Sequence, residues 1–159
     1  MSARTIYETA PLGALVRFSN GEPQPPARFI HKLRAWRRDN GEARLIAKTP
    51  SATVGRHVIP DCFTLFEGGY GPPGLVLLVV HREHSANSSL TFEVIEIPPA
   101  GCVLCLIAFR ELLELKHLAP DRAAAAAWHA SQRHVGDPHY REVQPDGTHL
   151  NLALEAFAP

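Results

Sequence analysis

Five strong bases and a single acid, Asp39, lie in the segment 26–41 (PARFIHKLRAWRRDNG). Positive side chains at this density are typical of surfaces that bind phosphate groups or clusters of carboxylates. We therefore predict that the segment contacts nucleic acid or an acidic protein surface. The candidate binding residues are Arg28, Lys32, Arg34, Arg37 and Arg38.

The same segment has helical periodicity. With successive residues rotated by about 100° around a helix axis, an apolar stripe separates from the bases. The stripe contains Phe29, Ile30, Leu33 and Trp36. It predicts a helix that docks on the core through this stripe and turns its bases outward. The alternative is a solvated outer face, since the segment matches no helix-turn-helix, zinc-finger or RNP-type pattern.

Two other motifs carry residue types that bind metals or do redox chemistry. Cys102 and Cys105 form a CxxC pair, and His81 and His84 have HxxH spacing. Both pairs fall in hydrophobic stretches that read as strands, where residues three apart point to opposite faces. This geometry opposes a disulfide and a shared metal ion. We therefore predict buried structural cysteines and no metal site.

Cys62 together with His57 or His81 has the elements of a Cys–His nucleophile. However, Cys62 opens the apolar run CFTLF, which favours a small buried side chain, and no sequence signature surrounds it. We predict no catalytic residue and no cofactor. An enzyme or metal protein built on His57, Cys62, His81 and His84 stays an alternative. The glycine-rich segment 68–74 leads into a strand and contains two prolines, so it reads as a hairpin connection.

Alternating and continuous apolar runs predict the remaining elements. Strands are expected at 12–18, 43–48, 63–67, 74–82, 89–97, 102–109, 139–143 and 149–157, with a bulge at 95–97. The run 110–118 fits a helix or a strand, and 49–61 reads as a loop with a short extended piece. Helices are expected at about 26–39 and 121–134. The predicted fold is a single α+β domain over 1–159, in which both helices pack on a mostly antiparallel meander of about five to seven strands.

Composition limits the classes of protein that fit. A chain of 159 residues with 45% hydrophobic content is long enough for a core and unlike a disordered protein. Its longest apolar runs, 75–80 and 102–109, are too short to cross a bilayer, and the first residues lack a secretory signal. Three cysteines favour reduced thiols. These features predict a cytoplasmic protein without a membrane partner.

The zero net charge conceals an asymmetry along the chain. Residues 1–50 hold 9 Lys and Arg against 4 Asp and Glu, whereas residues 51–159 hold 7 against 12. The two parts therefore carry +5 and −5, which allows pairing within the chain or between copies. Our leading hypothesis is a non-enzymatic binding protein that uses the basic helix. The alternative is an interaction or assembly module that forms a homo-oligomer through complementary charge.

Overall fold

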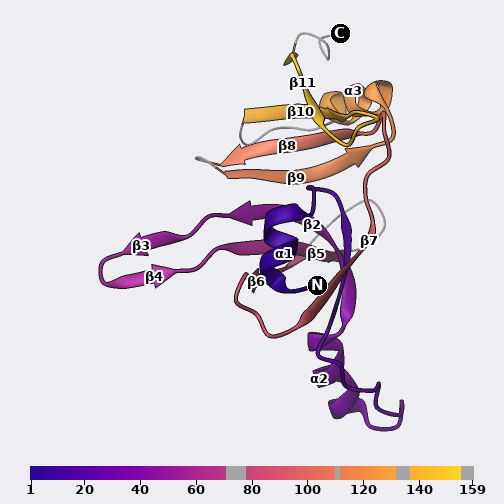
Figure 1. Cartoon of the computed structure of the whole chain (residues 1–159). Helices are drawn as coiled ribbons and strands as arrows, with labels where there is room; N and C mark the ends of the chain where they lie inside the picture. The colour runs from indigo at the N-terminus through magenta and orange to yellow at the C-terminus, as the bar shows by residue number, and fades with distance from the viewer. Residues whose placement is uncertain (71–77, 110–111, 132–136, 155–159) are drawn as a thin grey trace. The chain divides into compact units, whose positions relative to one another are not determined.

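The computed structural model describes residues 1–70, 78–109, 112–131 and 137–154. It contains two compact units, Met1–Glu96 and Ile97–Pro159. The described residues form three helices and eleven strands, and the strands belong to three antiparallel sheets (Figure 1). The α+β class and the antiparallel pairing are confirmed, but the single meandering sheet is wrong. The single domain over 1–159 stays a prediction.

The first unit is built on a five-stranded sheet in the order β6-β5-β2-β1-β7, and a separate hairpin of β3 and β4 extends beyond β2 and β5 (Figure 1). Strands β5 and β6 pair in sequence as the meander predicts, whereas β7 pairs with β1. The elements are α1 (Ala3–Thr9), β1 (Leu15–Ser19), α2 (Ile30–Asp39), β2 (Gly41–Thr49), β3 (Ala52–Val54), β4 (His57–Ile59), β5 (Cys62–Tyr70), β6 (Leu78–Ser85) and β7 (Thr91–Glu96).

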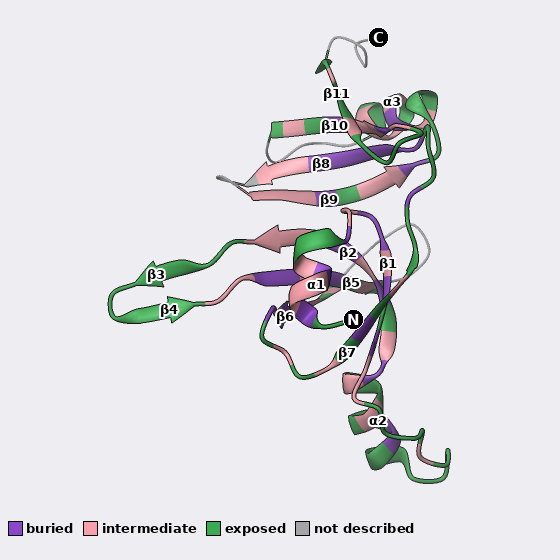
Figure 2. Cartoon of the chain, in the orientation of Figure 1, coloured by how far each residue is buried: buried purple, intermediate pink, exposed green. Residues whose placement is uncertain are grey.

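The core of this unit lies between one face of the sheet and α1, a helix that the sequence analysis did not predict. Ser2 caps the helix by accepting a hydrogen bond from the Thr5 amide at 3.1 Å. Ile6 is fully buried, in the same cluster as Val16 and Phe18 of β1. The short helix therefore closes the sheet face that the alternating strands make apolar (Figure 2).

Two local features of the first sheet follow from the sequence. The β1–β7 register pairs Leu15 with Glu96 and Val16 with Val94, so Ile95 is the extra residue of a bulge. The bulge predicted at 95–97 is confirmed. Gly41 pairs with Phe18, and a Cβ atom on Gly41 would lie 3.0 Å from the tip of the Phe18 ring. A side chain at position 41 would therefore displace a core aromatic ring.

Helix α2 differs from its prediction in extent and in packing. It begins at Ile30 and not near residue 26, and it lies beyond the ends of β1 and β2 rather than over a sheet face (Figure 1). Of the predicted stripe, Leu33 is buried and Trp36 half-buried, while Phe29 and Ile30 are 42% and 63% exposed. The docking prediction is therefore wrong for the first half of the stripe, because no sheet face lies against it.

The second unit has a four-stranded sheet in the order β11-β10-β8-β9. The ambiguous run 110–118 is a strand over its described residues, and the predicted final hairpin is confirmed by the pairing of β10 with β11. Its second strand, predicted over 149–157, ends at Leu152, and residues 155–157 lie outside the described residues. The predicted helix 121–134 corresponds to α3, with residues 132–134 outside the described residues. The elements are β8 (Val103–Phe109), β9 (Leu112–Ala119), α3 (Arg122–Ser131), β10 (Asp137–Val143) and β11 (His149–Leu152).

Helix α3 packs on β8 and β9, as predicted. Asp121 caps it by accepting a hydrogen bond from the Ala124 amide at 2.7 Å. Trp128 stacks on His117 of β9 with ring centroids 5.6 Å apart, and His129 is hydrogen-bonded to the Tyr140 hydroxyl at 2.6 Å. Aromatic and polar contacts thus fix the helix to its sheet. No helix within the described ranges combines the length and the apolar content needed to span a membrane.

His84 is the buried polar residue at the centre of the first unit. Its ring lies 5.2 to 5.5 Å from those of Phe18, Phe63 and Phe92, and its Nε2 atom has no hydrogen-bond partner among the described residues. Burial, with a further contribution from the charge of Arg82, lowers the pKa of His84 from 6.5 to about 4. The histidine therefore acts as a neutral member of an aromatic cluster.

This burial predicts a pH-dependent stability. Between its unfolded pKa of 6.5 and its folded pKa of about 4, His84 binds a proton more readily in the unfolded chain. The free energy of unfolding should therefore fall as the pH drops through this window, by roughly 3 kcal/mol at most. Urea unfolding measured at about pH 7 and about pH 4 would test this, with His84→Phe as the comparison. An equal pH dependence in both proteins would contradict the assignment.

Candidate functional site

The predicted binding residues lie on α2 and on the turn before it, and all five side chains are exposed. Arg34, Arg37 and Arg38 are spaced i, i+3 and i+4, so they share one side of the helix. We call these three residues the arginine face. Arg28 and Lys32 form a second group around Phe29, with the Arg28 Cζ and Lys32 Nζ atoms 4.9 and 5.5 Å from the ring centroid. The structure thus divides the five bases into two clusters.

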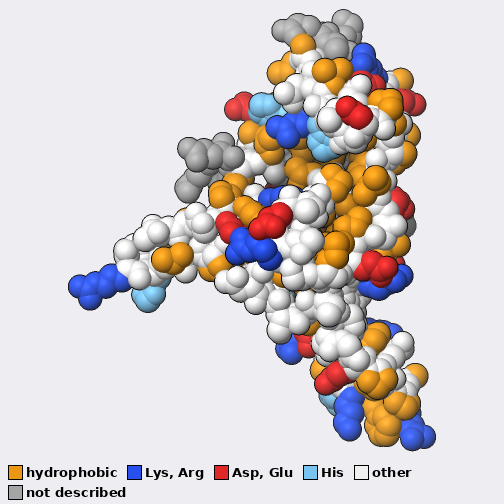
Figure 3. All heavy atoms as spheres, viewed as in Figure 1, with side chains coloured by type: hydrophobic (Ala, Val, Ile, Leu, Met, Phe, Trp, Pro, Cys, Tyr) orange, Lys and Arg blue, Asp and Glu red, His pale blue; other side chains and the backbone are white. Residues whose placement is uncertain are grey.

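These clusters have few counter-charges among the described residues. In the described part of the chain, the one salt bridge from the five bases joins Arg38 to Asp39, with Nε and Oδ1 3.4 Å apart. Both atoms belong to neighbouring residues on the surface, where such a pair contributes little to stability. Arg34 and Arg37 form no salt bridge with any described residue. Basic side chains therefore lie over the part of the first unit that α2 forms (Figure 3).

Other bases of the first unit behave differently. Arg17 of β1 bridges Glu42 and Glu93, at 2.9 Å each, and Arg4 pairs with Asp61. The Asp61 carboxylate holds the pKa of Arg4 above its ordinary value, and Arg4 lowers the pKa of Asp61. Ion pairs within this unit therefore neutralise part of the charge difference between residues 1–50 (+5) and residues 51–159 (−5). Four of the bases of this unit that form no salt bridge with a described residue lie on α2 or the turn before it (Arg28, Lys32, Arg34 and Arg37), and Lys48 and Arg56 are the others.

Asn40 attaches α2 to the sheet. Asn40 is 7% exposed, and its side chain forms hydrogen bonds with residues at the end of β1 and with a residue of α2. The Ser19 hydroxyl donates to Asn40 Oδ1 at 2.6 Å, and Asn40 Nδ2 donates to Asn20 Oδ1 at 2.8 Å and to the Trp36 carbonyl at 2.9 Å. These contacts tie the last turn of α2 to the end of β1.

Trp36 provides a second attachment. Its indole N–H donates to the Glu22 carbonyl at 2.8 Å, which holds the segment leading into the helix against the helix itself. Trp36 also lines a hollow of about 280 Å³ with Phe18, Asn40 and Gly41. The sequence patterns did not predict this network. The sequence feature that could have indicated this network is the pair Asn20 and Asn40, which stands at the two ends of the polar segment 20–40.

The structure does not bring together the four residues of the alternative Cys and His site, which are His57, Cys62, His81 and His84. His57 lies on the exposed hairpin of β3 and β4, and the β5–β6 register places Cys62 beside Ser85, on the face opposite to His84. His81 also lies on the face opposite to His84. Within the ranges that the structure describes, no group of three or more His, Cys, Asp or Glu side chains converges as a metal site would require.

The three cysteines are buried, and none of them is in a disulfide bond. Burial raises the pKa of Cys105 to about 12 and also raises that of Cys62. A thiol with a raised pKa holds little of the reactive thiolate near neutral pH. The prediction that Cys102 and Cys105 are buried is therefore confirmed.

Thiol modification gives a direct check. Iodoacetamide should leave Cys62, Cys102 and Cys105 of the native chain largely unmodified, because all three thiols are buried and the pKa values of Cys62 and Cys105 are raised. The chain unfolded in guanidinium should gain three carbamidomethyl groups. Intact mass before and after treatment measures both states. Rapid modification of native Cys105, or a Cys102–Cys105 disulfide in the purified protein, would contradict this description.

A substitution at Asn40 tests the attachment of α2. Asn40→Ala removes the hydrogen bonds that fix the last helical turn and should cost about 1–3 kcal/mol. Trypsin should then cut the arginine face several times faster than in the wild type, as followed by mass spectrometry. Asn151→Ala is the control, since Asn151 is exposed on β11 and its side chain forms no hydrogen bond with described residues. Equal cleavage of both variants would show that Asn40 does not hold the helix.

The family of the chain comes from comparison with known sequences. No curated protein and no solved structure matches it. A family model with the description "Uncharacterised conserved protein UCP036055" matches residues 1–147, which include all elements from α1 through β10. With this match over most of its length, the chain belongs to the family so described.

Proposed function

We propose that this protein is a non-enzymatic binding protein that contacts an anionic macromolecule through α2. The observation that carries the proposal is the arginine face, where Arg34 and Arg37 are exposed and form no salt bridge with described residues. Bases whose charge is not neutralised within the fold attract phosphates or carboxylates of a partner over a distance of about a Debye length.

The placement of α2 supports the same role. The helix lies beyond the ends of β1 and β2, so a partner can approach it from several sides (Figure 1). Its bases repel one another, since like charges at i, i+3 and i, i+4 destabilise a helix by a few tenths of a kcal/mol per pair. An anionic partner would relieve this repulsion between Arg34, Arg37 and Arg38. Helix stability and binding are therefore favoured by the same contact.

The arginine face suits nucleic-acid phosphates, and the second cluster favours an acidic protein surface as the other candidate partner. There, Phe29 is 42% and Ile30 63% exposed, beside Arg28 and Lys32. Interfaces between proteins are enriched in aromatic residues and arginine. An apolar pocket rimmed by carboxylates would match this cluster, whereas a duplex offers few apolar groups to it.

Charge reversal on α2 tests the proposal. Arg34→Glu and Arg34→Glu/Arg37→Glu should elute from heparin at progressively lower salt than the wild type. Duplex DNA binding, measured by fluorescence anisotropy, should weaken about tenfold or more for the double variant. The slope of log Kd against log salt should fall by about one for each phosphate that the variant no longer neutralises. The matched control is Arg56→Glu, an exposed arginine on the turn between β3 and β4 with the same change in net charge as Arg34→Glu.

The outcomes separate the candidate partners. Loss of DNA binding in the α2 variants but not in Arg56→Glu supports a nucleic-acid partner. Binding to poly-glutamate but not to DNA, with the same pattern among variants, supports an acidic protein surface. Salt-sensitive self-association without either ligand would favour the assembly module. Identical behaviour of Arg34→Glu and Arg56→Glu would overturn the role of α2.

A further inference from the structure

Four polar side chains gather where β10 pairs with β11 in the second unit. Arg141 lies opposite Asn151, and His149 lies opposite Val143 on the same two strands. Tyr140 points toward α3, where it meets His129, so the alternate residues His139 and Arg141 lie on the other face of the sheet. His139, Arg141, His149 and Asn151 thus share the face opposite to α3.

The two faces differ in how their polar groups are satisfied. On the α3 face, Arg122 pairs with Glu142 at 2.6 Å and Tyr140 is hydrogen-bonded to His129. On the opposite face, the side chains of His139, Arg141, His149 and Asn151 form no hydrogen bond or salt bridge with the residues that the structure describes. This face therefore offers a set of N–H donors whose partners the described part of the unit does not supply.

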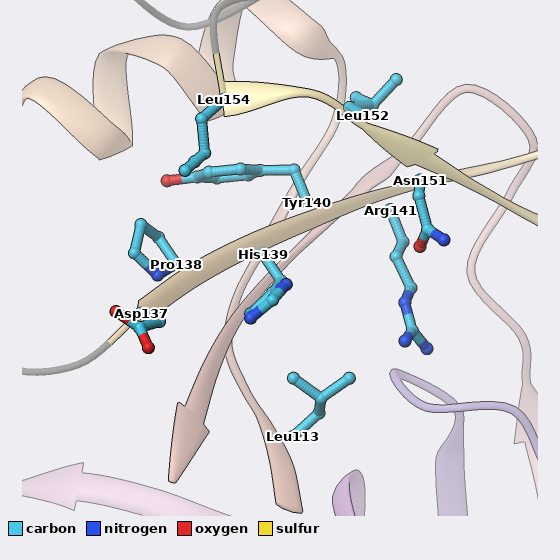
Figure 4. A pocket seen from close by; sticks show the side chains of 9 residues that line it. All are labelled: Leu113, Asp137, Pro138, His139, Tyr140, Arg141, Asn151, Leu152 and Leu154. Atoms are coloured by element: carbon cyan, nitrogen blue, oxygen red, sulfur yellow. The ribbon is translucent and has the colours of Figure 1, made fainter. Parts of the chain in front are cut away.

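A hollow of about 530 Å³ opens beside these donors. Figure 4 shows His139 and Arg141 on one side of β10, with Asn151 next to Arg141 and the Leu113 side chain across from His139. Tyr140 extends to the other side of the strand. A small molecule in the hollow on this side would meet polar groups along β10 and an apolar group from β9.

The charge on this face is positive around Arg141, which is half-buried. Asp137, which also lines the hollow, is the carboxylate nearest in sequence on the same face, and it lies four residues along β10 from Arg141, which is about 13 Å in a strand. Burial, and after it the charge of Arg141, lowers the pKa of His149. A half-buried guanidinium that lacks a carboxylate partner within the described residues favours an anion from outside.

We propose that Arg141, His139 and Asn151 form a binding site for the oxyanion group of a small organic molecule. The planar guanidinium binds two oxygens of a phosphoryl or carboxylate group at once. The amide of Asn151 and the imidazole of His139 donate to the same group from either side, and Leu113 contacts the organic part. This site lies in the second unit and is independent of α2.

Titration of the full chain tests the site. Inorganic phosphate in one arm and acetate in the other are added at low salt, and amide and side-chain NMR shifts of the second unit are followed. Arg141→Gln should weaken binding of the preferred anion at least tenfold. Arg122→Gln, on the opposite face, and Arg56→Glu, on the turn between β3 and β4, should keep the wild-type affinity within about twofold, as expected for surface changes outside the site. Arg34→Glu is measured beside them to report anion binding at α2.

The results have distinct meanings. Saturable shifts at His139, Arg141 and Asn151 that Arg141→Gln abolishes support the site, and the stronger arm identifies a phosphoryl or a carboxylate ligand. Equal binding by Arg141→Gln and the wild type would overturn it, as would the absence of saturation by about 50 mM of either anion, an affinity weaker than the millimolar scale. Loss of binding in Arg34→Glu alone would assign the anion to α2 and also overturn the proposal. Unfolding curves of all variants show whether each one is folded.

Discussion

The pairing of Phe18 with Gly41 is the contact on which the first unit depends. It joins β1 to β2 at the point where the chain leaves the sheet after Ser19 and returns to it at Gly41. Segment 20–40 must therefore begin and end at neighbouring positions, whatever its own structure. Because Gly41 lacks a Cβ atom, the Phe18 ring can occupy the space above it and complete the core beside His84. The Phe18–Gly41 pair thus completes the core and also holds the two ends of segment 20–40, which contains α2, next to each other.

This constraint explains how a strongly basic helix can coexist with a neutral chain. Along the strands, bases meet acids across the ladder, as Arg17 meets Glu42 and Glu93. Cross-strand neighbours of opposite charge stabilise a sheet, so a base on a strand is favourably placed opposite an acid. Helix α2 has no ladder partner, and it is attached to the first unit through Asn40, Trp36 and the buried Leu33. The excess positive charge is therefore concentrated where the fold constrains it least.

The sequence predicted the elements better than their arrangement. Periodicity located most of the strands, and the bulge at Ile95 followed from a local break in alternation. It did not locate β3 and β4, which lie in the segment 49–61 that was predicted as a loop with a short extended piece, and it left β9 open between helix and strand. Helix α1 was missed because seven residues are too few for a periodic signal, although Ser2 and Ile6 mark its cap and its buried side. The division into sheets depends on pairings between distant segments, such as β1 with β7, which no local pattern encodes.

The candidate sites were predictable to different degrees. The bases of α2 are visible as composition, but whether Phe29 and Ile30 are covered depends on where the sheet ends. The cluster around Arg141 escaped notice because its members come from two strands and become neighbours only through the register of β10 with β11.

The attachment of α2 at one end has a further consequence. A helix of ten residues is shorter than the about 12–15 needed for stability in isolation, and no described side chain caps its start at Phe29, so the helical fraction of α2 depends on its contacts with the rest of the first unit. Its apparent affinity for a partner that recognises the helix is then the intrinsic affinity multiplied by the helical fraction, and any change that raises this fraction tightens binding without adding a contact.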